Sequence, residues 1–239
     1  HALKNELYHE LTQNILPFWL DKMVDFRHGG YLGRIDGRGN IVPDAEKGAV
    51  LNARILWAFS AAYRVLNKAE YLEAATRAKD YFIAHFIDKQ HGGVFWSLDA
   101  QGQPLDTKKQ TYAMGFAIYG LSEYARDTGS DEALQYAQAL YNDIENRAFD
   151  KQNNGYVEAL TRSWQPIADM RLSDKDENGS RTMNTHLHIL EPYTNLYRVW
   201  RTPELAERIT NLIDIFLTHL LNKQTKHLDL FFDDRWQGK

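Results

Sequence analysis

The sequence contains no cysteine among its 239 residues, which excludes disulfide bonds, iron–sulfur clusters and thiolate metal sites. It also lacks any run of about 18 apolar residues, so no membrane span is expected. The 28 Lys and Arg residues are fewer than the 32 Asp and Glu residues, which argues against a nucleic-acid partner. No signal-peptide pattern opens the chain, and this, with the lack of cysteine, favours a cytoplasmic location.

Aromatic residues, in contrast, are abundant. The 6 Trp, 13 Tyr and 11 Phe residues make up 13% of the chain. Most of these rings are expected to pack in the core, but planar aromatic faces are also the surfaces against which sugar rings stack. The composition therefore mildly favours a carbohydrate ligand over an anionic one.

A short motif recurs at a nearly constant interval. His28-Gly29-Gly30-Tyr31 returns 63 residues later as His91-Gly92-Gly93-Val94, and 62 residues after that, more loosely, as Asn153-Asn154-Gly155-Tyr156. A degenerate fourth copy begins near His227. Turn-forming residues follow the first two copies, which predicts short hairpins, and a repeat of this length is typical of solenoids and toroids.

Two kinds of helical pattern separate successive motifs. The first kind is apolar on most faces and is predicted at 49–66, 111–126 and 183–200; the second is amphipathic and is predicted at 69–86, 131–146 and 203–221. An N-terminal helix over 3–23 brings the number to seven. Buried helices that alternate with solvent-facing helices predict an all-α toroid, an α/α barrel whose inner ring is covered by an outer ring.

Seven helices do not close such a ring. Stacked helical pairs need a neighbour on both sides, so an open ring exposes apolar faces to water. We therefore expect residues 1–239 to form a single domain, and to be the N-terminal portion of a barrel that continues in the full protein. The remaining segment would then be a partner of this one.

Polar side chains on the third buried helix mark a candidate site. Asn184, His188 and Glu191 share one face through their i, i+4 and i+3 spacing. Polar groups on a buried stripe need partners, either in the core or in a wet cavity. His188 is therefore either a satisfied core histidine or a general acid–base that faces a cavity. His186 lies on another face and is expected to pack, and because the two rings diverge on a helix no metal site is predicted.

Further candidates lie on the other buried helices and in one loop. Arg54 is either a structural anchor or a cation that stabilises a developing oxyanion, and Trp57 lies beside it. Tyr112 lies at the start of the second buried helix. Tyr112, Trp57, Asn184 and Glu191 are candidates to bind the substrate. Asp176, in the polar loop 173–179, is a candidate to hold a sugar hydroxyl, although a solvated loop acid is the alternative.

The run 181–194, together with 52–57 and 28–31, resembles the N-acylglucosamine 2-epimerase superfamily, and within it the cellobiose 2-epimerases. The resemblance extends from about residue 3 to residue 239. It implies an (α/α)6 barrel. It also implies epimerisation, without metal or cofactor, at C2 of the reducing-end glucose of a disaccharide such as cellobiose or lactose. The partner would be this small sugar, with no nucleic acid or membrane.

The resemblance also assigns residues to the substrate pocket: Arg54, Tyr112, Asp176, Asn184 and His188. Arg54 and His188 would donate to the carbonyl oxygen of the open-chain sugar as it becomes an enediolate, a contribution on the order of 3 kcal/mol per donor. Members of the family keep their two proton-transferring histidines, with tryptophans for stacking, in a more C-terminal part that this chain does not contain.

Other functions remain open at this point. The same fold could serve an N-acetylglucosamine 2-epimerase or a mannose isomerase. A glycoside hydrolase would need two carboxylates, for which Asp176 and Glu191 are the only pair to nominate. A non-catalytic helical array that binds sugar or protein is the third alternative.

Overall fold

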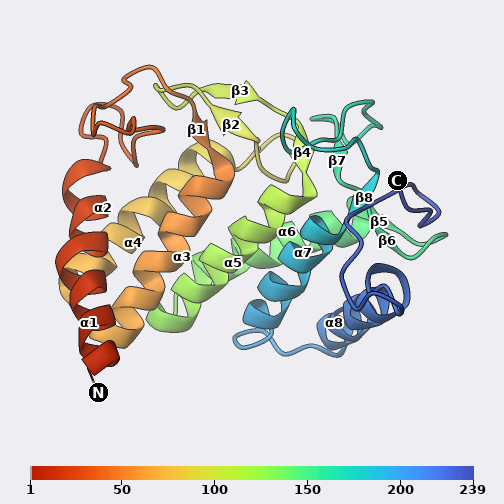
Figure 1. The fold of residues 1–239 in the computed structure, drawn as a ribbon. Helices are drawn as coiled ribbons and strands as arrows, with labels where there is room; N and C mark the ends of the chain where they lie inside the picture. Colours follow the sequence, from red (N-terminus) through yellow and green to blue (C-terminus); the bar gives the residue numbers. More distant parts are fainter. Residues whose placement is uncertain (1) are drawn as a thin grey trace.

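The computed structural model describes residues 2–239. Figure 1 shows its helices side by side, with the short strands and loops gathered at one end. The chain begins with α1 (Ala2–Glu10), the π-helical turn η1 (Leu11–Ile15) and α2 (Leu16–Lys22), which follow one another without a break. The single N-terminal helix predicted at 3–23 is therefore present, with a wider turn in its middle.

Three helices form the inner layer: α3 (Ala49–Leu66), α5 (Thr111–Thr128) and α7 (Met183–Leu196). α3 packs against α5, and α5 packs against α7. The boundaries of α3 agree with the prediction, whereas α7 ends four residues before the predicted 200. It ends early because the amide of Val199 bonds to the carbonyl of Leu196, closing a tight turn ahead of Pro203.

Three amphipathic helices form the outer layer: α4 (Ala69–Tyr81), α6 (Asp131–Asp143) and α8 (Pro203–Ile215). Each packs on the inner helix that precedes it in the chain. Each also runs into a π-helical turn, namely η2 (Phe82–Phe86), η3 (Ile144–Ala148) and η4 (Phe216–Leu220). Thr202 caps α8, since its hydroxyl oxygen accepts a hydrogen bond from the amide of Leu205. The two-layer helical array agrees with the predicted fold class.

In the described part of the chain, nine short strands lie at the loop end: β1 (Lys47–Gly48), β2 (Ser97–Leu98), β3 (Pro104–Asp106), β4 (Lys109–Gln110), β5 (Phe149–Asp150), β6 (Gly155–Tyr156), β7 (Ala159–Leu160), β8 (Arg181–Thr182) and β9 (Phe231–Phe232). All pairs are antiparallel. The strand that leads into an inner helix pairs with the loop of the next repeat: β1 with β2, β4 with β7, and β8 with β9. The start of each inner helix is thus tied to the repeat that follows it.

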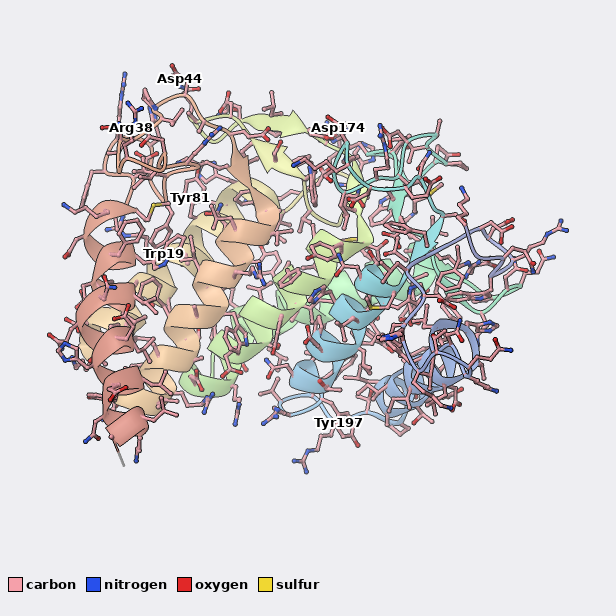
Figure 2. All side chains as sticks on the ribbon, in the orientation of Figure 1. Trp19, Arg38, Asp44, Tyr81, Asp174 and Tyr197 are labelled. Carbon is pink, nitrogen blue, oxygen red and sulfur yellow. The ribbon has the colours of Figure 1, made fainter. Side chains whose placement is uncertain are left out.

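The turns predicted after the first two motif copies are present, with Asp36 bonded to Asn40 and Asp99 to Gln103, and the Gly-Gly pairs of the motif itself also form turns. Gly29 and Gly30 have φ of 79° and 63°, a left-handed conformation that glycine adopts at no steric cost. Gly30 also lies against the ring of Tyr81, which is labelled in Figure 2, and a Cβ at Gly30 would come within 2.6 Å of that ring. Gly92 and Gly93 repeat the same conformation.

A buried ion pair anchors the chain before each inner helix. The cation stands two residues ahead of the helix and pairs with an aspartate that follows the preceding outer or N-terminal helix: Lys47 with Asp25, Lys109 with Asp88, and Arg181 with Asp150. None of the three cations has a side chain more than 1% exposed. Because an unpaired buried charge is costly, these pairs fix the loops relative to the helices.

Apolar surface remains uncovered at both ends of the array. A groove of about 510 Å³ lies between η1 and α3 and includes Leu11, Ile15, Trp19 and Val65. Leu217 on η4 is exposed at the other end. Apolar surface of this extent usually marks contact with other protein. Within residues 2–239 no helix is both long enough and apolar enough to cross a membrane.

Candidate functional site

The candidate residues fall into three layers on one face of the inner helices. α3, α5 and α7 begin at the same end and pack side by side, so residues at equal distance from the helix start lie at similar depth (Figure 1). Counted from the first residue of each helix, positions 2, 6 and 9 share a face because the helical period is 3.6 residues. They form the upper, middle and lower layers, in that order. Position 2 is Val50, Tyr112 and Asn184; position 6 is Arg54, Phe116 and His188; position 9 is Trp57, Tyr119 and Glu191.

The middle layer forms a continuous row across the three helices. The guanidinium carbon of Arg54 lies 5.1 Å from the centre of the Phe116 ring, and that ring lies 4.7 Å from the imidazole of His188. Phe116 is buried, whereas Arg54 is exposed and, with Trp57, lines the apolar groove between η1 and α3. The structure therefore places the predicted cation and the predicted imidazole on one surface.

Glu191 determines the orientation of the His188 ring. Its Oε2 lies 2.8 Å from Nδ1 of His188, and because a carboxylate only accepts, we assign the imidazole hydrogen to Nδ1. The pKa of His188 is lowered, mainly by burial and in smaller part by the charge of Arg54. Glu191 opposes this shift but does not cancel it. The lowered pKa favours the neutral ring, in which Nε2 is a hydrogen-bond acceptor. The edge of Tyr112 lies 5.0 Å from the ring.

The upper layer joins this row to a cavity. Burial raises the pKa of Tyr112, and Arg54 and Asn184 near its hydroxyl oppose this. Asn184 lines a cavity of about 280 Å³ together with Asp176 and Glu158. The structure thus brings Asn184 close to Tyr112, and Asp176 and Asn184 line the same cavity.

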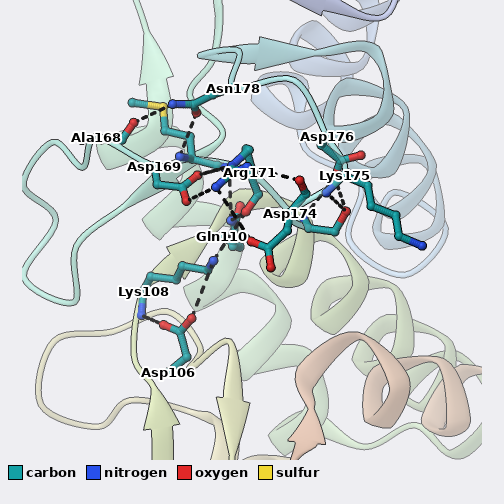
Figure 3. Close-up of polar contacts among 12 residues, drawn as sticks. Asp106, Lys108, Gln110, Ala168, Asp169, Arg171, Asp174, Lys175, Asp176 and Asn178 are labelled. Atoms are coloured by element: carbon teal, nitrogen blue, oxygen red, sulfur yellow. Dashed lines mark hydrogen bonds and ion pairs between the residues drawn. The ribbon is translucent and has the colours of Figure 1, made fainter.

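Asp176 lies in the loop shown in Figure 3, which covers the start of α5. Its Oδ2 accepts hydrogen bonds from the amide and the hydroxyl of Ser173, at 3.0 and 3.1 Å. Gln110, next to α5, donates to the carbonyls of Met170 and Arg171, and this anchors the loop. Asp176 is half-buried in an ordered turn.

Trp57 lies one layer below the Arg54–His188 row. Its ring lies 5.2 Å from that of Tyr119, and its buried Nε1 has no hydrogen-bond partner within residues 2–239. Tyr119 and Phe116 were not predicted as site residues, although they follow Tyr112 by seven and four residues on the same helix face. From the sequence of one apolar helix, aromatic residues are expected to pack in the core. Only the arrangement of the neighbouring helices shows that they line a site.

His186 packs in the core, as expected. It is 0% exposed, its Nε2 accepts from the amide of Tyr156 at 3.1 Å, and its Nδ1 lies 2.7 Å from the carbonyl of Thr182. Burial lowers its pKa to about 4. In the described part of the chain, no group of three or more His, Asp or Glu side chains gathers as a metal site would require.

Known proteins are similar to this chain in sequence. The model of the family described as N-acylglucosamine 2-epimerase matches residues 30–239. The chain is 61% identical over 237 residues to a cellobiose 2-epimerase of Bacteroides fragilis, covering 99% of this chain and 60% of that protein. It is 38% identical to a cellobiose 2-epimerase of Ruminococcus albus, covering 96% and 58%. The chain thus spans about 60% of the length of these relatives.

Solved structures agree in fold. The structure of cellobiose 2-epimerase from Bacillus thermoamylovorans matches with a TM-score of 0.95 at 44% identity, over 100% of this chain and 61% of that one. A D-mannose isomerase matches with a TM-score of 0.81 at 21% identity, over 95% and 56%, a likeness of fold alone. The predicted α/α-barrel class is confirmed by these matches. Because the family model covers most of its length, the chain belongs to the N-acylglucosamine 2-epimerase family.

Proposed function

We propose that the protein carrying this chain epimerises C2 of the reducing-end glucose in a β-1,4-linked disaccharide, converting it to mannose. The observation that carries the proposal is the row in which Arg54 and His188 flank Phe116 on one surface. The identity to relatives named cellobiose 2-epimerase supports cellobiose or lactose as the substrate.

The role of Arg54 follows from the acidity of the sugar. The C2 proton of an aldose is acidic only in the open-chain aldehyde, and its removal places negative charge on O1 as the enediolate forms. A guanidinium is permanently charged and donates several hydrogen bonds. Arg54 would stabilise that oxygen by an amount on the order of 3 kcal/mol.

His188 would act on the same oxygen in two steps. Its neutral Nε2 accepts the proton of the anomeric hydroxyl while the C1–O5 bond breaks, and O5 takes a proton from another acid. The imidazolium formed in this way is held by Glu191 and donates back to O1 as negative charge develops. The donor role expected for His188 therefore requires a preceding acceptor step.

The surrounding residues would hold the disaccharide. Tyr112 and Trp57 offer aromatic surface on either side of the row, and aromatic faces suit sugar rings. Asn184 and Asp176 face the adjoining cavity, where an amide and a carboxylate can bond to hydroxyl groups. We assign these four residues to substrate binding.

Completion of the site would need more protein. Inversion at C2 requires a proton-transferring group on each face of a planar intermediate, and Arg54 and His188, which act on O1, supply neither of them. We propose that further helices of a longer chain cover the groove at Leu11 and Val65 and complete a single-domain barrel. The activity proposed here is that of the whole protein.

Incubation of the whole protein with cellobiose in deuterated water tests the proposal. Glucosyl-mannose with deuterium at C2 is the expected product by NMR. Release of free glucose would indicate a glycoside hydrolase instead, and unchanged cellobiose with measurable binding would indicate a sugar-binding protein. Parallel reactions with mannose and N-acetylglucosamine identify the other epimerase or isomerase activities.

A further inference from the structure

Glu158 is a buried carboxyl that the proposed mechanism does not use. It lies between β6 and β7, is 1% exposed, and has only neutral hydrogen-bond donors. Burial of a carboxyl among neutral groups is unfavourable. Its presence therefore calls for a local explanation.

The side chain of Glu158 holds the first turn of α7. Its Oε1 accepts from the amide of Thr182, the residue before the helix, at 2.7 Å. Its Oε2 accepts from the hydroxyl of Thr185 at 2.6 Å. Asn184 lies between these two contact points, and His188 follows one turn later.

The backbone of the same residue holds the start of α5. The carbonyl of Glu158 accepts from the amide of Thr111, the first residue of that helix, at 3.0 Å. Tyr112 is the next residue. Glu158 therefore links the two helix ends that present Tyr112 and Asn184 to each other.

Two of the other repeats place an apolar residue at this point. The amide of Ala49, which begins α3, donates to the carbonyl of Trp96, and the amide of Met183, which begins α7, donates to that of Leu230. Trp96, Glu158 and Leu230 are therefore equivalent. The backbone hydrogen bond at this position forms equally well with an apolar side chain. The carboxyl of Glu158 therefore has a role that is specific to the contact between α5 and α7.

The surroundings of the carboxyl agree with a link to the site. Glu158 lines the cavity of about 280 Å³ that Asp176 and Asn184 also line. Burial, with a smaller contribution from Asp176, raises the pKa of Glu158 to about 8. Near neutral pH the group is thus largely protonated, which makes glutamine a close substitute.

We propose that Glu158 is a positioning residue, which fixes the first turn of α7 against the start of α5 so that Asn184 and His188 keep their places beside Tyr112. The inference rests on the proposed epimerase function for its kinetic consequences. Its geometric consequence, the placement of His188, is independent of any activity.

Three variants of the whole protein test this. Glu158→Leu installs the residue type found at the equivalent Leu230 and removes both side-chain hydrogen bonds. Glu158→Gln keeps an acceptor for the amide of Thr182. Thr202→Ala is the matched control, because it removes a hydrogen bond at the start of outer helix α8, away from the site.

Displacement of a reacting group by about 1 Å costs up to about a hundredfold in rate. We expect Glu158→Leu to lower kcat by about tenfold to a hundredfold at temperatures well below its Tm, and Glu158→Gln to recover activity to within about threefold. Thr202→Ala should lower Tm without changing kcat. Equal loss of kcat in Thr202→Ala at a matched loss of Tm, or unchanged kcat in Glu158→Leu, would overturn the proposal.

An NMR measurement on histidine-labelled protein separates this proposal from the function. The rings of Tyr112 and Phe116 lie 5.0 and 4.7 Å from the His188 ring, so their ring currents report its position. The His188 signal should shift in Glu158→Leu and return in Glu158→Gln, even if the protein lacks epimerase activity. If Glu158→Leu fails to fold, Thr185→Val removes one of the two bonds and should shift the signal in part. An unmoved signal in the folded variant refutes the positioning role.

Discussion

Alanine substitutions of His188 and His186 should separate function from stability, although the two residues lie only two positions apart on α7. The side chain of His188 is 18% exposed, and its partner Glu191 is 41% exposed. Removal of the ring lets water solvate the Glu191 carboxylate. We expect His188→Ala to lower the free energy of unfolding by about 1–2 kcal/mol, the worth of one hydrogen bond and some packing.

His186→Ala should behave in the opposite way. Its two ring nitrogens bond to the amide of Tyr156 and the carbonyl of Thr182, and both groups lie in the interior. Each buried backbone group left without a partner costs about 1–3 kcal/mol, and the lost ring leaves a cavity. The expected loss is about 3–5 kcal/mol.

The assays are urea unfolding and the initial rate with cellobiose for the whole protein. His188→Ala should lower turnover by about a hundredfold to a thousandfold, as loss of one oxyanion donor does. His186→Ala should keep its turnover per folded molecule within about threefold. An equal loss of stability in both variants, or near-normal turnover in His188→Ala, would show that His188 is a core residue and refute the reasoning.

Three further predictions concern the framework. Asp88→Ala should cost about 3–5 kcal/mol in urea unfolding, because it leaves Lys109 buried and unpaired and removes the acceptor of the amides of Gln90 and His91. The added change Lys109→Met should restore only the part that comes from the unpaired Lys109. Burial raises the pKa of Asp127 from 3.8 to about 6, so stability should fall as pH rises from 3.8 to 6, and Asp127→Asn should remove this slope in Tm measured between pH 4 and 8. Gly115→Ala should lower Tm and turnover together, because the added methyl would collide with the carbonyl of His188 and separate α5 from α7.

The helical layers could be predicted because apolar residues repeat at helical spacing along the chain. Local pattern gives the start of α3 at Ala49 and the cap of α8 at Thr202. The π-helical turns after the outer helices could not be foreseen, since one extra residue in a turn leaves no mark in apolar spacing. The pair of Lys109 and Asp88 was equally hidden, because charged loop residues are usually solvated and their burial depends on contacts between repeats.

The site was predictable within one helix and not between helices. The spacing of His188 and Glu191 on α7 indicates their contact, which the structure shows at 2.8 Å. The row from Arg54 through Phe116 to His188 depends on how three inner helices align, which no local pattern reports. The role of Glu158 likewise becomes visible only when the loops of successive repeats are compared in space.

A crystal structure of the whole protein with the alditol of cellobiose tests the central claim most directly, because the alditol imitates the open-chain sugar. The account predicts that O1 of the alditol lies within hydrogen-bond distance of both the Arg54 guanidinium and Nε2 of His188. An alditol bound elsewhere, with neither group in contact with O1, would contradict it.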